Sequence, residues 1–379
     1  MKTQQVKNPL GSNERKLLNI VRQHGIMPRH KIVEHMDVSV QAVGQIVRRL
    51  DQYQLLTHHK AVTVGLGQPP KPMSVNADGA FSVGIKIGRR HTDVLLVDLL
   101  GCVRDRYSIA YEFPVAHELL AKIEQHLHRI QAQLTQEDHL LIGIGIAMPF
   151  ALGGWHKLLG LSEAQASEWN ALDITAAIQA MTTCPVKLAK DTAAACIAEL
   201  LNGQGRHYQN FLYLFLDTFV GGSVVSQGRM LESKHGNAGA VASVPMSLTM
   251  AQDQLLNHAS LWELEGRLSA QSFEPLAAYS EEALSTQHLK QTQDWLASAS
   301  QALAFAIVSG TAFLDMDAVV IDGSMAPLLL QKLITQTEDA LKAFNWEGLW
   351  QPKLLAGLVG SDAGALGGAL IPLHEYFYA

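Results

Sequence analysis

The chain of 379 residues has little cysteine, little charge and no long apolar run. Three cysteines, Cys102, Cys184 and Cys196, are too few and too scattered for a disulfide framework or a cysteine zinc site. No run of about 18 apolar residues is present, so we expect no membrane-spanning helix. The N-terminus also lacks the apolar segment of a secretory signal. With 48% hydrophobic and 17% charged residues, the sequence predicts a folded protein of two or three domains in a reducing cytoplasm.

Charge is distributed unevenly along the chain. Residues 1–72 hold 11 Lys and Arg against 4 Asp and Glu, a balance of +7. The remainder holds 18 against 31, a balance of −13. A basic module on an acidic body favours contact between that module and a polyanion, although charge alone fits an ordinary solvated face equally well.

The first 55 residues show three short helical patterns. The first contains Leu17 and Ile20 at helical spacing and stops at Gly25, and the second can start at Pro28. The third begins with Ser39 as N-cap and buries a stripe of apolar residues. The members of this stripe are Val43, Ile46, Val47 and Leu50.

Three short helices on a basic module predict a helix-turn-helix, with a small helical bundle without nucleic-acid function as the alternative. The third helix would lie in the major groove, where glutamine amides suit adenine and arginines suit phosphate or guanine. Residues 55–64 alternate like a hairpin and would form a wing with His58, His59 and Lys60 at its tip. The predicted DNA-binding residues are Ser39, Gln41, Ala42, Gln45, Arg48, Arg49 and Lys60.

Residues 65–72 break regular structure and predict a linker, and beyond them strand-like and helix-like stretches alternate. Strands are expected at 83–88 and 92–98, a helix at 116–134, and a buried strand at 140–147. A similar pattern recurs with strands at 211–217 and 318–323 and a helix at 291–314. Two such halves predict an actin-like ATPase (ribonuclease-H-like) α/β body in two lobes.

The chain resembles the ROK family (repressors, open reading frames and kinases), in particular its regulators. These fuse a winged helix-turn-helix to a sugar-kinase-like body, and include glucose- and N-acetylglucosamine-responsive repressors. Each matching segment is short, but all occur in the family's order along the chain. The segments are Ser39 to Leu50, Gly67-Gln68-Pro69-Pro70, Gly143 to Pro149, Pro185 to Ala195, Gly221-Gly222, Gly228-Arg229, Gly236-Asn237-Ala238-Gly239 and Gly360 to Ala369.

Departures from the family's kinase motifs are concentrated at the phosphate loop and the sugar site. The acidic residue of the phosphate loop is Lys86 here, followed by Arg89 and Arg90, which removes a carboxylate that supports Mg²⁺. Asp191 stands at the family's catalytic base position, and a helix N-cap is the alternative interpretation. Because the Asn before that base is Lys190 here, neutral sugars lose a hydrogen-bonding partner.

The segment that holds sugar and a structural zinc in the family is also altered. Its Glu and His correspond to positions within 240–243, where the chain reads Ala-Val-Ala-Ser, and no cysteine follows Cys196. We therefore predict no metal and no cofactor, and His235 alone is no zinc site. Phe150 follows Pro149 where the family has Gly, so its ring is expected to fill space that a sugar would use. The predicted effector-binding residues are Lys190, Asp191 and Ser243.

The favoured interpretation is a cytoplasmic, DNA-binding transcriptional regulator, a repressor of carbohydrate genes, with a degenerate and non-catalytic body. The alternatives are an active ROK hexose kinase that uses ATP, and an interaction protein without a DNA role. The expected partners are a double-stranded operator, a sugar or sugar-derivative effector, and further copies in a homodimer or homotetramer. The expected domains are 1–72 for the winged helix, 73–185 with 356–379 for the first lobe, and 186–355 for the second lobe.

Overall fold

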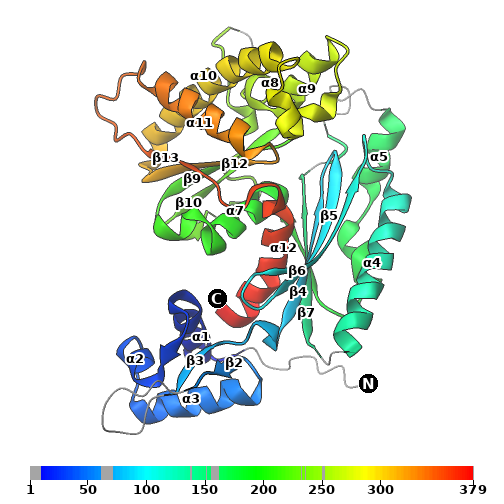
Figure 1. Ribbon diagram of the computed structural model, residues 1–379. Helices are drawn as coiled ribbons and strands as arrows, with labels where there is room; N and C mark the ends of the chain where they lie inside the picture. Colours follow the sequence, from blue (N-terminus) through cyan, green and yellow to red (C-terminus); the bar gives the residue numbers. More distant parts are fainter. Residues whose placement is uncertain are drawn as a thin grey trace. The chain divides into compact units, whose positions relative to one another are not determined.

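The computed structural model describes residues 10–60, 71–136, 139–150, 152–154, 162–231, 233–234, 236–249 and 252–378. Its internal contacts divide the chain into two compact units. The first unit comprises residues 1–189 and 368–379, and the second unit comprises residues 190–367. Figure 1 shows an N-terminal domain and one mixed sheet with helices in the first unit, and another mixed sheet with helices in the second.

The N-terminal domain confirms the predicted winged helix-turn-helix. Its helices are α1 (Ser12–His24), α2 (Arg29–Glu34) and α3 (Val40–Gln52). Its strands are β1 (Met27–Pro28), β2 (Leu56–His58) and β3 (Pro72–Val75), in the antiparallel order β1-β3-β2. Gly25 ends α1 with a positive φ of 74°, and Ser39 caps α3 by accepting a hydrogen bond from the Ala42 amide at 3.2 Å. The predicted apolar stripe of α3 is buried.

The wing differs from the sequence prediction. The partner of β2 is Pro72–Val75, not residues 61–64, which lie with most of the predicted linker outside the described residues. Pro72 begins β3 opposite Pro28, so two residues without an N–H face each other and no backbone donor is lost. The winged fold therefore extends to residue 75. His58 ends β2 and His59 directly follows it, and their rings bond Asp51 and Ser74, both at 2.8 Å.

The first unit contains a sheet of five strands in the order β6-β5-β4-β7-β8. The strands are β4 (Phe81–Ile87), β5 (His91–Asp98), β6 (Val103–Ala110), β7 (Leu141–Met148) and β8 (Val186–Lys190), whose last residue is already assigned to the second unit. The helices of this part are α4 (Ala116–Gln136), α5 (Glu163–Ala171), α6 (Ile174–Gln179) and the end of α12 (Ala363–Leu373) from Gly368 on. Strands β4 to β6 form an antiparallel meander, and β7 runs parallel to β4, as expected.

Alternating residues of β7 face two different helices. Ile144 and Ile146 belong to the apolar cluster that includes Ile123 and Leu127 of α4. On the other face of the strand, Gly145 meets the backbone of α12 at Gly368 so closely that a Cβ would overlap its carbonyl oxygen. Figure 1 shows α4 and α12 on opposite sides of this sheet. The glycines in this buried strand therefore serve the approach of α12.

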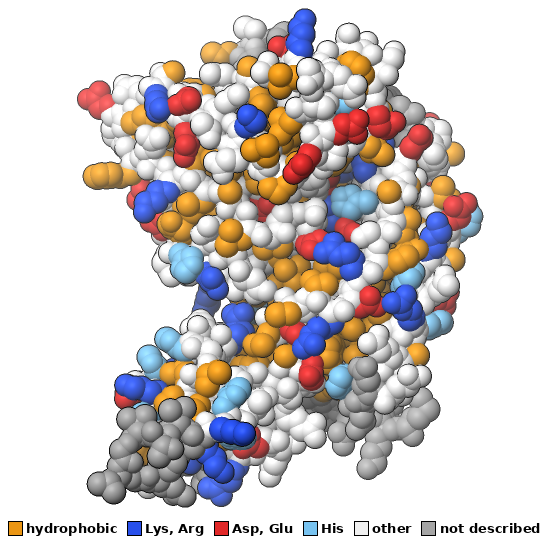
Figure 2. Space-filling view, in the orientation of Figure 1, with side chains coloured by type: hydrophobic (Ala, Val, Ile, Leu, Met, Phe, Trp, Pro, Cys, Tyr) orange, Lys and Arg blue, Asp and Glu red, His pale blue; other side chains and the backbone are white. Residues whose placement is uncertain are grey.

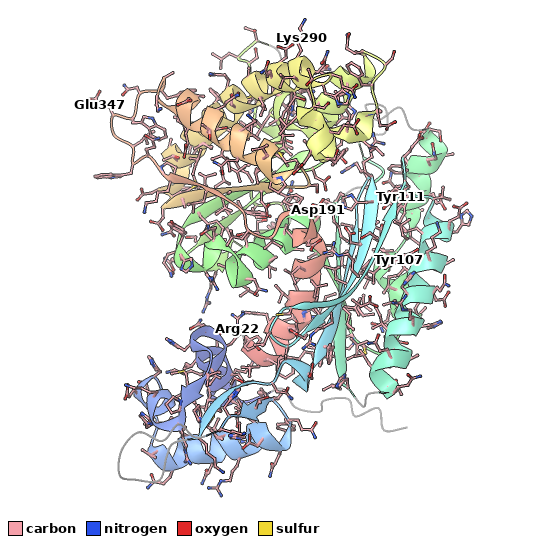
Figure 3. All side chains as sticks on the ribbon, viewed as in Figure 1. Arg22, Tyr107, Tyr111, Asp191, Lys290 and Glu347 are labelled. Carbon is pink, nitrogen blue, oxygen red and sulfur yellow. The ribbon has the colours of Figure 1, made fainter. Side chains whose placement is uncertain are left out.

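The C-terminal segment packs against the N-terminal domain. The π-helical turn η7 (His374–Tyr378) follows α12 and contacts α1. The Arg22 guanidinium lies over the Tyr378 ring, 4.8 Å from its centre, and the Tyr378 hydroxyl donates a hydrogen bond to the Leu99 carbonyl at 2.9 Å. Arg22 is labelled in Figure 3. Burial raises the pKa of the Tyr378 hydroxyl, so the ring stays neutral beside the cation.

The second unit repeats the pattern with a sheet in the order β11-β10-β9-β12-β13. Its strands are β9 (Phe211–Leu216), β10 (Val220–Ser226), β11 (Arg229–Met230), β12 (Ala318–Gly323) and β13 (Lys353–Ala356). Its α-helices are α7 (Asp191–Asn202), α8 (Leu256–Ala259), α9 (Leu261–Ser269), α10 (Leu289–Leu314) and α11 (Pro327–Leu341). Again antiparallel strands come first and a parallel strand follows, which confirms the predicted duplicated architecture.

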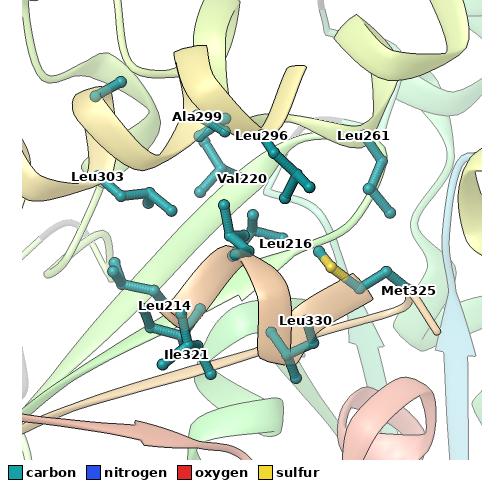
Figure 4. Packing of buried hydrophobic residues seen from close by; sticks show 14 of the residues in the cluster. Leu214, Leu216, Val220, Leu261, Leu296, Ala299, Leu303, Ile321, Met325 and Leu330 are labelled. Carbon is teal, nitrogen blue, oxygen red and sulfur yellow. The ribbon is translucent and has the colours of Figure 1, made fainter. Parts of the chain in front are cut away.

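Helix α10 forms much of the core of the second unit. Figure 4 shows Leu214 and Leu216 of β9 in one cluster with Leu296 and Leu303 of α10 and Leu330 of α11. Among the described residues, α10 is the one helix long and apolar enough to cross a membrane, but half of its most apolar window is buried inside the protein. Such burial is typical of a helix in the core of a folded domain.

Two buried carboxylates support a loop of the second unit. Glu199 of α7 accepts backbone hydrogen bonds from Leu358 at 2.5 Å and Val359 at 2.8 Å. Asp322, at the end of β12, accepts hydrogen bonds from the Tyr213 hydroxyl at 3.1 Å and the Gly360 amide at 3.2 Å. Burial, and secondarily the nearby Glu199, raises the pKa of Asp322 to about 6. The loop is thus held in part by Asp322, whose ionised form is destabilised by burial at neutral pH.

Asp322 predicts a specific dependence of stability on pH. Below about pH 3 its carboxyl carries a proton in both the folded and the unfolded chain. As pH rises, the unfolded chain loses this proton first, near pH 4, so stability falls until the folded chain also loses it near pH 6, and it stays lower above that pH. Relative to Asp322→Asn, the free energy of unfolding should fall by about 2 kcal/mol from pH 4 to 7.

Chemical denaturation of both proteins across this pH range measures the difference. Asp294→Asn, which removes an exposed carboxyl on α10, is the matched control. A constant difference between the wild type and Asp322→Asn would contradict the prediction.

Candidate functional site

The outward face of α3 presents the side chains predicted to contact DNA. Gln41, Gln45, Arg48 and Arg49 are exposed, and Ala42 is half-buried. Ser39 has its predicted capping role and lies at the start of this face. Lys60 is exposed just beyond β2, at the edge of the described part of the wing. The structure thus places the predicted residues where a recognition helix needs them, and their contact with DNA remains a prediction.

Basic side chains of this domain differ in how they are paired. Arg49 lies 2.8 Å from Glu14, a buried carboxylate of α1, so this arginine also fastens α3 to α1. Lys16 and Lys31 pair with Asp37 and Glu34 at 2.6 and 3.1 Å. Figure 2 shows several Lys and Arg side chains on the surface of this domain.

Sequence reasoning missed Arg29, which begins α2 and reaches α3. Its Nη2 donates a hydrogen bond to the Val40 carbonyl at 3.1 Å. The guanidinium fills the space that a side chain at Gly44 would need. A glycine inside an otherwise regular helix was the available signal, because such a residue usually marks a close approach by another group.

Side chains of β4, β5 and β6 bond one another beside the turn that the resemblance matches to the family's phosphate loop. Lys86 is buried, and its Nζ lies 3.0 Å from Nε2 of His91. The same His91 nitrogen is 3.3 Å from Asp93, which also accepts a hydrogen bond from Ser108 at 2.5 Å. Lys86 therefore lies in a Lys–His–Asp–Ser network inside the sheet.

A tyrosine closes the turn between β4 and β5. The Tyr111 hydroxyl donates to the Gly88 carbonyl at 3.0 Å and lies 2.6 Å from the Thr92 hydroxyl. Arg90 donates to the Glu112 carbonyl at 2.6 Å. These bonds join the turn to the end of β6, so its backbone groups are engaged within the unit.

In the second unit, Lys190 and Asp191 stand at the start of α7, where Figure 3 labels Asp191. Nζ of Lys190 donates to Oδ1 of Asn237 at 2.8 Å, and burial lowers the pKa of Lys190 against the opposing effect of Asp191. Asp191 occupies the first helical position rather than the N-cap, and its Oδ1 accepts the Thr192 amide at 2.7 Å. The carboxylate is thus stabilised by the positive end of the helix dipole.

Lys190 faces a segment built on close backbone contacts. Gly222 of β10 and Gly239 lie so close together that a side chain on either residue would press against the backbone of the other. Gly239 also has a positive φ of 75°. Ser243 is exposed on the 3-10 turn η3 (Val241–Ser243) beyond this contact. Among the described residues, no hydrogen bond joins Ser243 to Lys190 or Asp191. Lys190 and Asp191 are neighbours in the sequence, and a shared effector site with Ser243 stays a prediction.

Two predictions from the sequence concern the sugar site and the zinc site of the family. Phe150 is 75% exposed, so its ring is not enclosed by other described residues, and the expectation that it takes up space used by a sugar in the family stays a prediction. In the part of the chain that is described, no three His, Cys, Asp or Glu side chains could hold a metal ion together. Zinc needs about four such donors, and the described residues 236–243 offer none of these types. The segment does not fit the family's zinc, and His235 lies outside the described residues.

The chain belongs to the ROK family, whose family model matches residues 82–375. It is 23% identical over 375 residues to an uncharacterized protein of Sinorhizobium fredii, covering 97% of this chain and 92% of that protein. It is 23% identical over 255 residues to the xylose repressor of Bacillus subtilis, covering 66% of this chain and 65% of the repressor.

A solved structure resembles the fold over nearly the whole chain. It is described as a ROK family transcriptional regulator homologous to the E. coli MLC protein. The TM-score is 0.70, with 19% identity and 96% of each chain covered. The similarity supports the same combination of an N-terminal winged helix and a two-lobed, actin-like body in both chains.

The donor set near η3 predicts the metal content of the purified protein. We expect well under one zinc per chain by elemental analysis, because the segment lacks the family's ligands. A chelator should leave the melting temperature unchanged, since no metal contributes to folding. One zinc per chain, removed by chelation with a fall in melting temperature, would contradict this interpretation of residues 240–243.

Proposed function

We propose that this protein is a DNA-binding transcriptional regulator, acting as a repressor of carbohydrate-related genes in the cytoplasm. The observation that carries the proposal is the capped helix α3, which presents Gln41, Gln45 and Arg48 on a basic winged domain. The dimensions and polarity of such a helix suit the major groove. The relatives named as a xylose repressor and a transcriptional regulator support the same class.

Operator recognition by this class favours a symmetric oligomer. One helix reads only a short half-site, and two-fold related copies read two half-sites about one helical turn apart. We therefore propose a homodimer, or a tetramer of such dimers, bound to a pseudo-palindromic duplex. The body would supply the contacts between copies.

The body is proposed to be non-catalytic. Phosphoryl transfer needs a base for the sugar hydroxyl proton and a metal–phosphate loop that neutralises the transferred group. Asp191 can supply only the first function. In the metal–phosphate loop, Lys86 replaces the acid and lies within hydrogen-bonding distance of His91 inside the sheet. The Lys86 cation cannot support Mg²⁺ as a carboxylate does.

The effector is proposed to be a sugar or sugar derivative held near Lys190, Asp191 and Ser243. Lys190 has a half-buried amino group within hydrogen-bonding distance of Asn237. An ammonium in such surroundings favours an anionic ligand, such as a sugar acid or sugar phosphate, over a neutral hexose. Each hydrogen bond lost to a buried sugar hydroxyl costs about 1 kcal/mol or more, which weakens neutral hexoses further.

The DNA proposal predicts two kinds of variant. Gln45→Ala should change sequence preference, because an amide that pairs with a base edge is lost. Lys60→Ala should weaken binding to all duplexes alike and lower the salt dependence, because a phosphate contact is lost. Fluorescence anisotropy on duplexes selected from a random pool and on the unselected pool separates these effects. Failure of the wild type to select any sequence would contradict the proposal.

The kinase alternative is tested by ADP release with ATP and a panel of hexoses. We expect no turnover above the level of Asp191→Ala, because the phosphate loop lacks its carboxylate. In a parallel thermal-shift screen, anionic sugars should stabilise the wild type but not Lys190→Ala. Turnover that disappears in Asp191→Ala would establish the kinase instead. Stabilisation by glucose but by no anion would contradict the anionic effector.

A further inference from the structure

Two arginines converge on the one glycine inside the recognition helix. Arg29, from α2, hydrogen-bonds the Val40 carbonyl at 3.1 Å and lies against Gly44. Arg48, one turn beyond Gly44 on α3, donates from Nε to the Gly44 carbonyl at 3.3 Å. Residues 40, 44 and 48 follow one another at four-residue spacing, so they line one edge of the outward face of α3.

No carboxylate compensates these two guanidinium groups. Within the described residues, neither Arg29 nor Arg48 forms an ion pair, whereas Lys16, Lys31 and Arg49 of the same domain each have one. The segments 1–9 and 61–70, which flank the described part of this domain, contain no Asp or Glu in their sequence. Both arginines are exposed. Two like charges held at one glycine repel each other, and an anion from outside the domain that bound both would relieve this repulsion.

The chemistry and the position identify this anion. Guanidinium groups present paired N–H donors that match the oxygens of a phosphate. In a helix-turn-helix the helix before the recognition helix crosses the DNA backbone, and Arg29 begins that helix. We propose that Arg29 and Arg48 together bind one phosphate of the DNA backbone, with Gly44 as the seat of Arg29. This phosphate clamp rests on the proposed DNA-binding function and adds a residue to it.

The clamp also explains a residue that is unfavourable for its helix. Glycine in a helix interior costs up to about 1 kcal/mol relative to alanine. At position 44 a methyl group would overlap the Arg29 guanidinium, so alanine would force that side chain away from α3. The helix gives up intrinsic stability at the point where the second basic group is held.

Three variants test the clamp on the full-length protein. Arg29→Ala removes the charge, and Gly44→Ala keeps the charge but fills its seat. Lys31→Ala is the matched control, because it removes an equal charge from the same helix but one already paired with Glu34. The probe is a random-sequence duplex pool, measured by anisotropy over a series of salt concentrations beside the melting temperature of each variant.

Arg29→Ala should weaken binding about ten-fold or more, as expected for a charge-assisted hydrogen bond to phosphate. Its slope of log affinity against log salt should fall by about 1. Gly44→Ala should lose affinity to a similar extent at an unchanged or higher melting temperature. Such a loss without destabilisation is not expected of a residue with a merely structural role, and Lys31→Ala should change little.

The outcomes separate the clamp from the function on which it rests. If the wild type binds the pool and Arg29→Ala binds like Lys31→Ala, the clamp is wrong and the DNA-binding function stands. If Gly44→Ala binds like the wild type while Arg29→Ala does not, Gly44 is not the seat. If the wild type binds no duplex, both proposals fail. Should Arg29→Ala fold poorly, Gly44→Ala still decides the question.

Discussion

The first unit depends on the close approach of α12 to β7. The backbones of Gly145 and Gly368 are in direct contact, so a side chain at Gly145 would overlap the Gly368 carbonyl oxygen. The Ser82 hydroxyl adds a hydrogen bond to the Ala369 carbonyl at 2.7 Å within the same contact. With α4 packed on the opposite face, the sheet is covered on both sides, and the course of α12 directs the following turn η7 to the N-terminal domain.

A single exchange of charge sign sets the chemistry of the body. The sheet that would present a carboxylate to a metal and a phosphate instead encloses Lys86 beside His91 and Asp93. The scaffold of a phosphoryl-transfer enzyme is retained, together with an acid at Asp191, while the loop is held by bonds within its own unit. Under the function proposed above, such a body would bind a ligand and change the affinity of the attached winged domain for DNA.

The sequence allowed the helix-turn-helix, both sheets and the long helices to be predicted, because each has a clear apolar period or cap. The second wing strand at Pro72–Val75 was missed because prolines normally end a strand, and only its pairing with Pro28 makes the position acceptable. Burial of Lys86 and exposure of Phe150 could not be predicted, since both depend on neighbours distant in the sequence. Arg29 was missed for the same reason, although Gly44 gave an indirect signal.

The contact between Arg22 and Tyr378 joins residues that are far apart along the chain. During synthesis α1 leaves the ribosome long before η7 exists, so its outer face stays uncovered while the intervening body is made. Closing so long a loop is favourable only once the body has folded and fixed the position of α12. The contact between α1 and η7 is therefore among the last to form, although α1 is translated first.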